Sequence, residues 1–454
     1  MNHIIEKALR QLKSGVEEIA GKVDRNGISP QSLSEFERSL QGSLGEFARE
    51  KEKAVLEAAD LEKPSIVIDG VRHYWKYKGP QDYQCLFGKI EVRRSVYQAN
   101  GEKTVCPLEV YAGILHHHLT PVAVEFVSYG VAHMVPAELA EFCRRWQRLT
   151  PSETVIKQVA GEVGEMAEMI QEDCEESIRS EENVAEETRV VTVSRDGTSV
   201  NIRNEGWRQA QVGAVACYGP LVKVEDEEKE RRERLRTVYV GQMPEEDTPS
   251  FNAKLDREVG HVLKELPAAC QIVCLADGAI GIWNYFKTHP LLKKAVHIND
   301  FHHAADHLAD IANALFGEGT AKAEAWFKKH RSILKRQAGG AERVIRSIRY
   351  YRRVESTRSP KRWEGIRDGL RFFTRNRSRM KYAEYRRRGL PIGSGVVEAA
   401  CKTLVGQRFK RSGMRWSVDG AQNILNLRAA VLSKRWDAFW KFHEQALCLT
   451  PIVA

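Results

Sequence analysis

Apolar side chains recur at helical spacing through most of the first 61 residues. Two segments carry this pattern, residues 2–22 and residues 31–61, and both are predicted to be helices. From residue 65 to residue 108 the pattern changes to short runs rich in β-branched and aromatic side chains. Turn-forming pairs separate these runs, which predicts a small β-rich unit. The pairs are Asp69-Gly70, Gly79-Pro80 and Asn100-Gly101.

Residues 121–182 return to helical spacing in three consecutive segments with short connections. The third segment opens with Thr150-Pro151-Ser152-Glu153, which predicts a capping box with Thr150 as the N-cap and proline at the first helical position. Three such helices suit a DNA-binding helix-turn-helix unit, and they suit an ordinary helical bundle equally well. In the first case three arginines would be available to phosphates. These are Arg144, Arg145 and Arg148.

The third helical segment carries an apolar stripe that could form either a dimer seam or an interior face of one protomer. The stripe consists of Ile156, Val159, Val163, Met166 and Ile170. Residues 162–187 also hold 11 Asp and Glu against a single basic residue, Arg179. This composition predicts an exposed helix end followed by a linker.

Beyond the linker, the order of predicted elements becomes specific. Three β-runs at residues 188–200, 209–219 and 235–243 precede an amphipathic helix, the apolar β-run CQIVCLADGA, a short helix and a last β-run, KAVHINDFHHA. An almost wholly apolar run predicts a central strand that is buried on both faces. This order matches an RNase H-like α/β domain, a mixed sheet with helices on both faces.

Three acidic residues occupy the positions at which such a sheet gathers carboxylates. Asp196 lies on the first β-run, Asp277 ends the central run, and Glu398 lies in the first turn of a helix predicted from Val396 onward. An aspartate before a glycine is, by itself, more typical of a turn. Three carboxylates together suit Mg²⁺, and two such ions about 4 Å apart can stabilise both the entering and the leaving oxygen of a phosphodiester. The sequence therefore predicts a two-metal Mg²⁺ site in which Mn²⁺ would substitute.

Positive charge is concentrated in one block of the chain. The net charge is +9, whereas residues 322–416 alone hold 28 Lys and Arg against 7 Asp and Glu. Aromatic residues are interleaved with these charges, and such a surface suits nucleic acid because each neutralised phosphate releases counterions. A solubilising surface is the alternative, although such surfaces usually mix both signs. The predicted DNA contacts are Arg375, Arg377, Arg379, Lys402, Arg408, Lys410, Arg411, Arg415 and Trp416.

Cysteine usage and hydropathy restrict the remaining possibilities. The nine cysteines are scattered without any CxxC pair, so neither a disulfide framework nor a zinc site is predicted. No run of about 18 apolar residues occurs, and the N-terminal segment lacks the apolar core of a signal peptide. We expect a cytoplasmic protein that associates with the nucleoid when it is bound to DNA.

Several motifs carry a more specific resemblance. They are RDGT at 195–198, LADGA at 275–279, DFHH at 300–303, GLPIGSGVVEAACK at 389–402, SGMRWS at 412–417, GAQ at 420–422 and NLR at 426–428. Together these motifs resemble the ISKra-type insertion-sequence transposases of bacteria, members of the DDE superfamily. The resemblance runs from about residue 65 to residue 440 and is weakest over residues 1–63.

The resemblance implies a transposase that binds the terminal inverted repeats of its own element in double-stranded DNA. It would cleave there to expose a 3′-OH and join that end to target DNA, acting as a homodimer or a higher homo-oligomer. Asp196, Asp277 and Glu398 would bind the metal. Asp300 and His303 match a D-x-x-H signature, in which His303 would orient a phosphate or a triad carboxylate; a histidine that caps the next helix is the alternative. Some relatives carry N-terminal zinc-binding cysteine pairs, which are missing here, so end recognition without zinc is expected.

The same reasoning divides the chain into six parts. They are residues 1–63, N-terminal helices; 64–118, the small β-rich unit; 119–187, a helix-turn-helix-like region with the acidic linker; 188–303, the first part of the RNase H-like core; 304–388, a basic all-helical insertion; and 389–454, the second part of the core with the Glu398 helix and a C-terminal helix.

Two other functions stay open from the sequence. One is an RNase H-like nuclease without strand transfer, and the other is a domesticated DNA-binding protein that no longer catalyses. The predicted DNA-binding region and the large insertion argue against a minimal nuclease. The presence of all three acids argues against a loss of catalysis.

Overall fold

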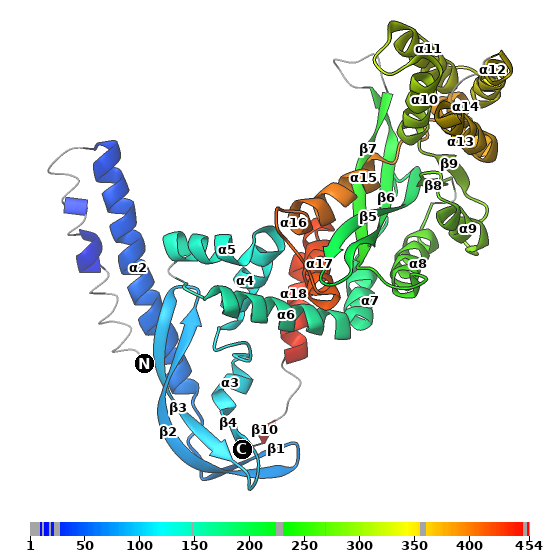
Figure 1. Cartoon of the computed structure of the whole chain (residues 1–454). Coiled ribbons are helices and arrows are strands. Elements are labelled where there is room, and N and C mark those ends of the chain that lie inside the picture. The colour runs from blue at the N-terminus through cyan, green and yellow to red at the C-terminus, as the bar shows by residue number, and fades with distance from the viewer. Residues whose placement is uncertain are drawn as a thin grey trace. The chain divides into compact units, whose positions relative to one another are not determined.

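The computed structural model describes residues 10, 13–17, 20–21, 28–147, 149–223, 230–267, 269–354, 360–447 and 452–453 (Figure 1). Most of the helix predicted at residues 2–22 lies outside the described residues, as does Arg148. The chain forms two compact units. Unit 1 contains Met1–Cys174 and Arg435–Ala454, and unit 2 contains Glu175–Lys434. The C-terminal helix, which was expected to complete the second part of the core, therefore belongs to unit 1.

Unit 1 contains the predicted small β structure, an antiparallel sheet in the order β10-β1-β2-β3-β4. Helix α2 (Pro30–Ala59) lies along β3, where Glu57 Oε1 accepts from the Arg93 amide at 3.1 Å and Asp60 Oδ1 accepts from the Ser95 amide at 2.9 Å. The helix thereby covers an edge that would otherwise expose unpaired backbone groups. The strands are β1 (Ser65–Ile68), β2 (Val71–Cys85), β3 (Gly88–Gln98), β4 (Thr104–Val105) and β10 (Ile452–Val453).

Strand β2 continues through Gly79-Pro80, where the sequence predicted an interruption. Its register with β3 shifts between Trp75 and Tyr77, and Pro80 still lies opposite Arg93. Strand β1 pairs with β2 only as far as Tyr74. Beyond that residue β2 is an edge strand on this side, so a proline without an amide hydrogen is tolerated there.

The helical part of unit 1 shows where the apolar stripe lies. Ile156, Val159 and Val163 of α6 are each 0% exposed within the single chain and form an interior face, whereas Met166 and Ile170 are half-buried. Helix α18 also packs within this unit, where Trp436 Nε1 donates to Glu125 Oε1 at 3.1 Å. The helices of unit 1 after α2 are α3 (Pro107–Tyr111), α4 (Pro121–His133), α5 (Pro136–Phe142) with a π-helical turn at Cys143–Gln147, α6 (Glu153–Met169) and α18 (Trp436–Leu447).

Helix α6 begins later than the sequence predicted. Ser152 is its N-cap, with extended backbone angles, and its side-chain oxygen accepts from the Val155 amide at 3.2 Å. The Thr150 amide instead donates to Gln84 Oε1 at 3.1 Å, which holds Thr150 outside the helix. A contact with the β2 strand has therefore displaced the expected cap by two residues.

Unit 2 is built on a five-stranded mixed sheet in the order β7-β6-β5-β8-β9. Strands β5, β6 and β7 form an antiparallel meander, whereas β5, β8 and β9 run parallel. The predicted succession of β-runs and helices is thus found, and the unit is mixed α/β. The strands are β5 (Val190–Ile202), β6 (Gly206–Lys223), β7 (Glu230–Gln242), β8 (Gln271–Ala276) and β9 (Val296–Asn299).

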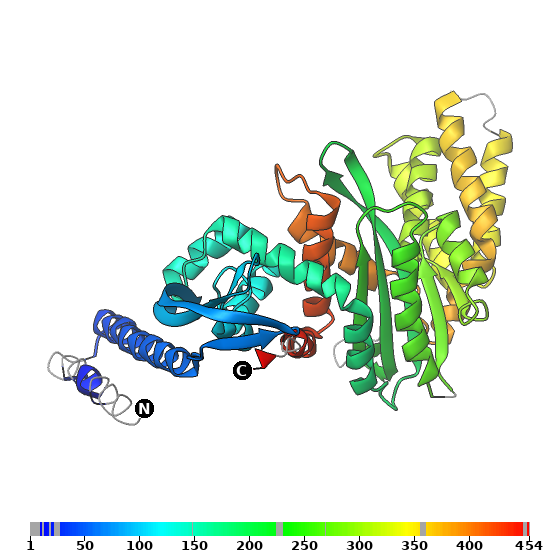
Figure 2. The same cartoon turned by 90° about the horizontal axis from the view of Figure 1, so that it is seen from below.

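Alternate residues of β8 face two different apolar cores, as expected for a strand buried on both faces. Cys274 and Ala276 join a core formed with α8 (Pro249–Lys264) and α9 (Ile280–Thr288). Val273 and Leu275 join a second core formed with the helices that follow β9. Figure 2 shows these helices on both sides of the sheet. Among the described residues, we find no helix with the length and apolar character needed to cross a bilayer.

The segment after β9 is helical, as predicted. The sequence placed Asp300, His302 and His303 on the last strand, but β9 ends at Asn299, Asp300 caps α10, and both histidines lie in that helix. The remaining elements of unit 2 are α7 (Gln171–Glu181), which begins in unit 1, α10 (Phe301–Phe316), α11 (Ala321–Arg336), α12 (Gly340–Val354), α13 (Pro360–Asn376), a 3-10 turn at Arg377–Arg379, α14 (Tyr382–Arg387), α15 (Gly395–Ala400), a π-helical turn at Cys401–Gly406, α16 (Gln407–Phe409) and α17 (Val418–Leu432).

The revised start of α6 can be tested by a matched pair of variants. We expect Ser152→Ala to lower the stability of the chain by about 1 kcal/mol, because the Val155 amide loses its capping partner. Thr150→Ala should change it by less than about 0.5 kcal/mol. Urea unfolding followed by circular dichroism measures both. A larger loss for Thr150→Ala than for Ser152→Ala would return the N-cap to Thr150.

Candidate active site beside β5 and β8

Asp196 is a half-buried carboxylate on β5, on the sheet face covered by the π-helical turn after α15. Its Oδ1 accepts from the Gly197 amide at 2.7 Å, and the Cys401 thiol lies 3.6 Å from Oδ2 as a donor. Burial raises the pKa of Asp196, and the negative charges of Asp277 and Glu398 raise it further against the opposing effect of the Gly197 hydrogen bond. Asp196 therefore senses both of the other predicted acids.

Asp277 directly follows β8, beside the strand that carries Asp196. The two strands are parallel and pair Ser194 with Leu275, so two further residues along each chain bring Asp196 and Asp277 to the same level. Asp277 Oδ1 accepts from the Ala279 amide at 2.8 Å, and its carbonyl accepts from Trp283 Nε1 at 2.7 Å. These bonds fix the turn from which the carboxylate extends.

Glu398 reaches the site from α15, where a chain of hydrogen bonds fixes its side chain. Ser394 Oγ donates to Glu398 Oε1 at 2.8 Å. The buried carboxylate of Asp300 in turn accepts from the Ser394 amide and, at 2.6 Å, from the His303 amide. The Asp300 amide donates to the carbonyl of Ala276 at 2.8 Å. Asp300 thus connects the end of β8, the start of α10 and the start of α15.

His303 lies in the first turn of α10, and its half-buried ring borders a hollow beside Asp277. The hollow has a volume of about 300 Å³, and its far wall is α13. Phe372 of α13 packs against Gly278, where an added Cβ would lie 2.4 Å from the phenyl ring. Arg375 Nη2 donates to the Gly278 carbonyl at 2.9 Å. The turn after β8 therefore requires a glycine, because α13 packs directly on it.

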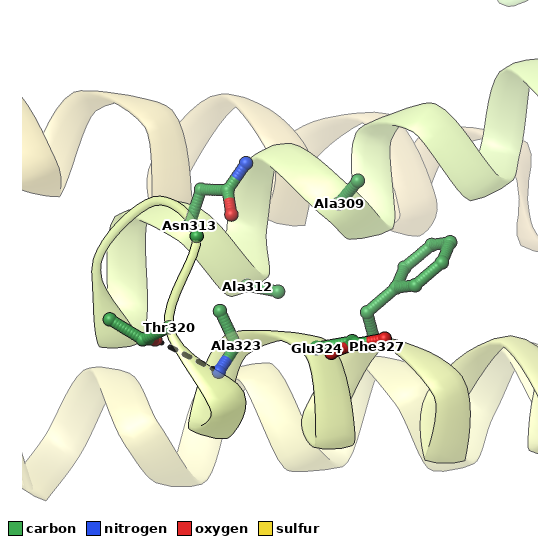
Figure 3. Close-up of a pocket in the computed structure, with 8 residues that line it drawn as sticks. Ala309, Ala312, Asn313, Thr320, Ala323, Glu324 and Phe327 are labelled. Carbon is green, nitrogen blue, oxygen red and sulfur yellow. Dashed lines mark hydrogen bonds between the residues drawn. The ribbon is translucent and has the colours of Figure 1, made fainter.

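A second hollow, of about 260 Å³, lies between α10 and α11, and none of the three predicted acids lines it. Its walls are mostly small or apolar, with Ala312, Ala323 and Phe327 between the two helices (Figure 3). Thr320 beside it caps α11 by accepting from the Ala323 amide at 3.2 Å. This arrangement offers packing and capping, so the hollow beside Asp277 is the better candidate for chemistry.

The structure places the predicted DNA contacts in two classes. Arg379 is 8% exposed and lies 4.3 Å from the Trp283 ring, and Arg408 is 2% exposed and lies 5.0 Å from the Trp416 ring. Burial of both guanidinium groups removes them from the predicted DNA surface, because phosphates cannot reach them. Trp416 is half-buried and donates from Nε1 to the Phe409 carbonyl. The exposed members are Arg375, Arg377, Lys402, Lys410, Arg411 and Arg415.

Two residues near the acids were not predicted to contribute to the site. Ser394 orients Glu398, and Cys401 contacts Asp196. Burial raises the pKa of the Cys401 thiol, and the neighbouring Asp196 raises it further, so the thiol stays protonated and can donate. The serine just before a predicted helix was a recognisable capping signal, whereas nothing in the sequence indicates the cysteine contact.

The side chains at the candidate site determine whether it could hold a metal ion. In the described part of the chain, no three His, Cys, Asp or Glu side chains stand close enough together to hold an ion as they are oriented here. Asp196, Asp277 and Glu398 nevertheless supply hard carboxylate oxygens, the donor type that magnesium prefers, so the types of side chain suit a magnesium-type ion.

No known protein family matches the chain, and no curated protein is similar to it.

The repulsion at Asp196 predicts a pH-dependent effect on stability. A carboxyl group with a raised pKa in the folded chain favours folding while it is protonated, and this contribution is lost as the pH rises through that pKa. In EDTA at pH 7.5, Asp196→Asn should therefore raise the Tm by on the order of 2 °C. The gain should shrink toward pH 4.5.

The exposed Asp310→Asn serves as the control for this measurement, because it changes the same charge on the surface of α10. Differential scanning calorimetry at four pH values measures both variants. Equal Tm values for Asp196→Asn and the unaltered chain at every pH would show that the surroundings of Asp196 do not raise its pKa.

Proposed function

We propose that unit 2 is an RNase H-like catalytic domain and that the protein is a DDE transposase. The observation that carries the proposal is the convergence of three elements on Asp196: parallel pairing puts it level with Asp277, and Cys401, three residues after Glu398, contacts it at 3.6 Å. The strand order β7-β6-β5-β8-β9, with an antiparallel meander followed by two parallel strands, supports the fold assignment. The sequence resemblance to ISKra-type transposases supports the reaction.

In this proposal Asp196, Asp277 and Glu398 hold Mg²⁺, or Mn²⁺ in its place. The bound ions would stabilise negative charge on the attacking and leaving oxygens and lower the pKa of bound water. The chain itself orients the acids. Ser394 fixes one oxygen of Glu398, Asp300 fixes Ser394, and Cys401 donates to Asp196. Asp300, Ser394 and Cys401 are positioning residues, because each acts through another side chain.

The proposed partner is double-stranded DNA, both at the terminal inverted repeats and at the target. Exposed lysines and arginines of unit 2 would bind phosphates, which provides affinity without sequence information. Lys410 lies near the acids, because its Nζ contacts Thr198 Oγ1 at 2.5 Å, two residues along β5 from Asp196. Recognition of the repeats is assigned to the helices of unit 1 and pairing of two ends to a homo-oligomer. Ile156, Val159 and Val163 of α6 would not contribute to that pairing, because they are buried within the chain.

The catalytic assignment predicts a separation of cleavage from binding. Asp196→Asn, Asp277→Asn and Glu398→Gln should each reduce Mg²⁺-dependent nicking by roughly a thousandfold or more, since each removes a metal ligand. Binding measured in EDTA should stay within about threefold, because phosphate contacts lie elsewhere. The probe is a labelled duplex made from the DNA that flanks the gene.

Asp306→Asn is the matched control, an exposed acid on α10. It should nick like the unaltered chain. Any triad variant that nicks within about tenfold of the control would lose its place in the proposed metal site.

The transposase can be distinguished from a plain nuclease by the fate of the 3′-OH. When a pre-cleaved end with a free 3′-OH is supplied with a plasmid, we expect covalent joining that requires Mg²⁺ and all three acids. Inverted repeats and short target duplications should also flank the gene. Cleavage without joining would favour the nuclease, and binding without either reaction would favour a domesticated DNA-binding protein.

A further inference from the structure

We propose that the hollow between the Asp277 turn and α13 is a subsite for a phosphate of the DNA strand, adjacent to the one that reacts. This inference rests on the proposed function, because it takes nucleic acid as the substrate. The hollow has a volume of about 300 Å³ and is lined by residues from three elements. Those used below are Asp277, His303, His307, Asp368, Arg371 and Arg375.

Two arginines give the hollow its preference for an anion. Arg371 and Arg375 lie four residues apart on α13, so they project from the same face of that helix. Arg375 is anchored on the Gly278 carbonyl, whereas Arg371 forms an exposed ion pair with Asp368 at 3.5 Å. Such a pair is weak in water, so the Arg371 guanidinium can turn to a phosphate, for which its planar donor fork is well suited.

The other walls indicate which phosphate would bind. Asp277, a proposed metal ligand, forms one wall, and α13 forms the opposite wall. A strand whose reacting phosphate lies at the acids would pass a neighbouring phosphate into the hollow. His303 and His307 also line the hollow and add nitrogen atoms to it. Their rings meet edge to face with centroids 5.0 Å apart. The phenyl ring of Phe372, 3.8 Å from the His307 ring, closes the apolar side.

Helix α13 supplies an internal control. Arg367 lies one turn before Arg371, is similarly exposed and contacts the same Asp368, at 3.6 Å, but it does not line the hollow. Arg371→Gln and Arg367→Gln therefore remove the same charge from almost the same place. If a diffuse electrostatic field attracts the DNA, the two variants should lose the same DNA affinity. If the hollow is a specific phosphate subsite, Arg371→Gln should lose more affinity than Arg367→Gln.

The test measures binding of the full chain to a labelled 40-base-pair duplex from the DNA that flanks the gene. It is carried out in EDTA at several salt concentrations. We expect Arg371→Gln to weaken binding roughly tenfold, as for the loss of hydrogen bonds to a charged group, and to reduce the salt slope by about 1. Arg367→Gln should stay within about twofold. Equal losses for the two variants would overturn the proposal.

Asp368→Asn separates a ligand contact from a structural one. If Arg371 binds phosphate, removal of its competing carboxylate should tighten DNA binding by about twofold to threefold. If the Arg371–Asp368 pair merely supports the fold, Asp368→Asn and Arg371→Gln should weaken binding together. If both variants bind DNA more weakly, or if both lower the Tm by the same amount, the subsite proposal is overturned.

Free phosphate could bind the hollow through the same chemistry, and a separate experiment tests this. If inorganic phosphate raises the Tm only when Arg371 is present, and Arg371→Gln leaves the DNA affinity unchanged, the hollow would be assigned to free phosphate. Binding is measured without divalent metal, so these outcomes do not depend on cleavage. A chain that never nicks DNA could still show the Arg371 pattern, and an active transposase could lack it.

Discussion

The gathering of three carboxylates from three separate elements is the constraint on which the site in unit 2 depends. Asp196, Asp277 and Glu398 come from β5, the end of β8 and α15, and burial, with a smaller effect of the other two charges, raises the pKa of Asp196. Burial of a carboxylate opposes folding, so other contacts must hold the three elements together. The parallel pairing of β5 with β8 fixes two of the acids through the backbone. The third depends on Asp300, whose carboxylate binds the Ser394 amide that precedes Glu398.

The parts of this arrangement that depend on local pattern could be predicted from the sequence. The apolar β8 run, the meander and the positions of Asp196 and Asp277 follow from periodicity, because a strand buried on both faces has few polar residues. The helix that carries Glu398 also follows from spacing. What could not be predicted depends on contacts between distant segments. The Thr150 amide bonds to Gln84 and shifts the start of α6, and Asp300 turns from a strand residue into the cap of α10.

The basic block at residues 322–416 shows that the positions of charged side chains are also hard to predict from the sequence. A run of arginines predicts an exposed surface, since most charged side chains remain in water. Arg379 and Arg408 are nevertheless buried over tryptophan rings, where desolvation lowers the pKa of Arg379 although its guanidinium stays charged. For Arg379 the partner, Trp283, comes from a distant segment, and a local charge pattern cannot predict that contact. Some arginines of the block are therefore packed inside unit 2, and others expose their charge to solvent.

The helices after β9 are an integral part of unit 2. The core beneath one face of the sheet joins Val273 and Leu275 of β8 to apolar residues of α10, α12 and α13. Phe372 and Arg375 of α13 then pack directly on Gly278, next to Asp277. A displacement of α13 would leave both the apolar face and the turn of Asp277 without support. The helical segment thus stabilises the fold and shapes the candidate site through the same contacts.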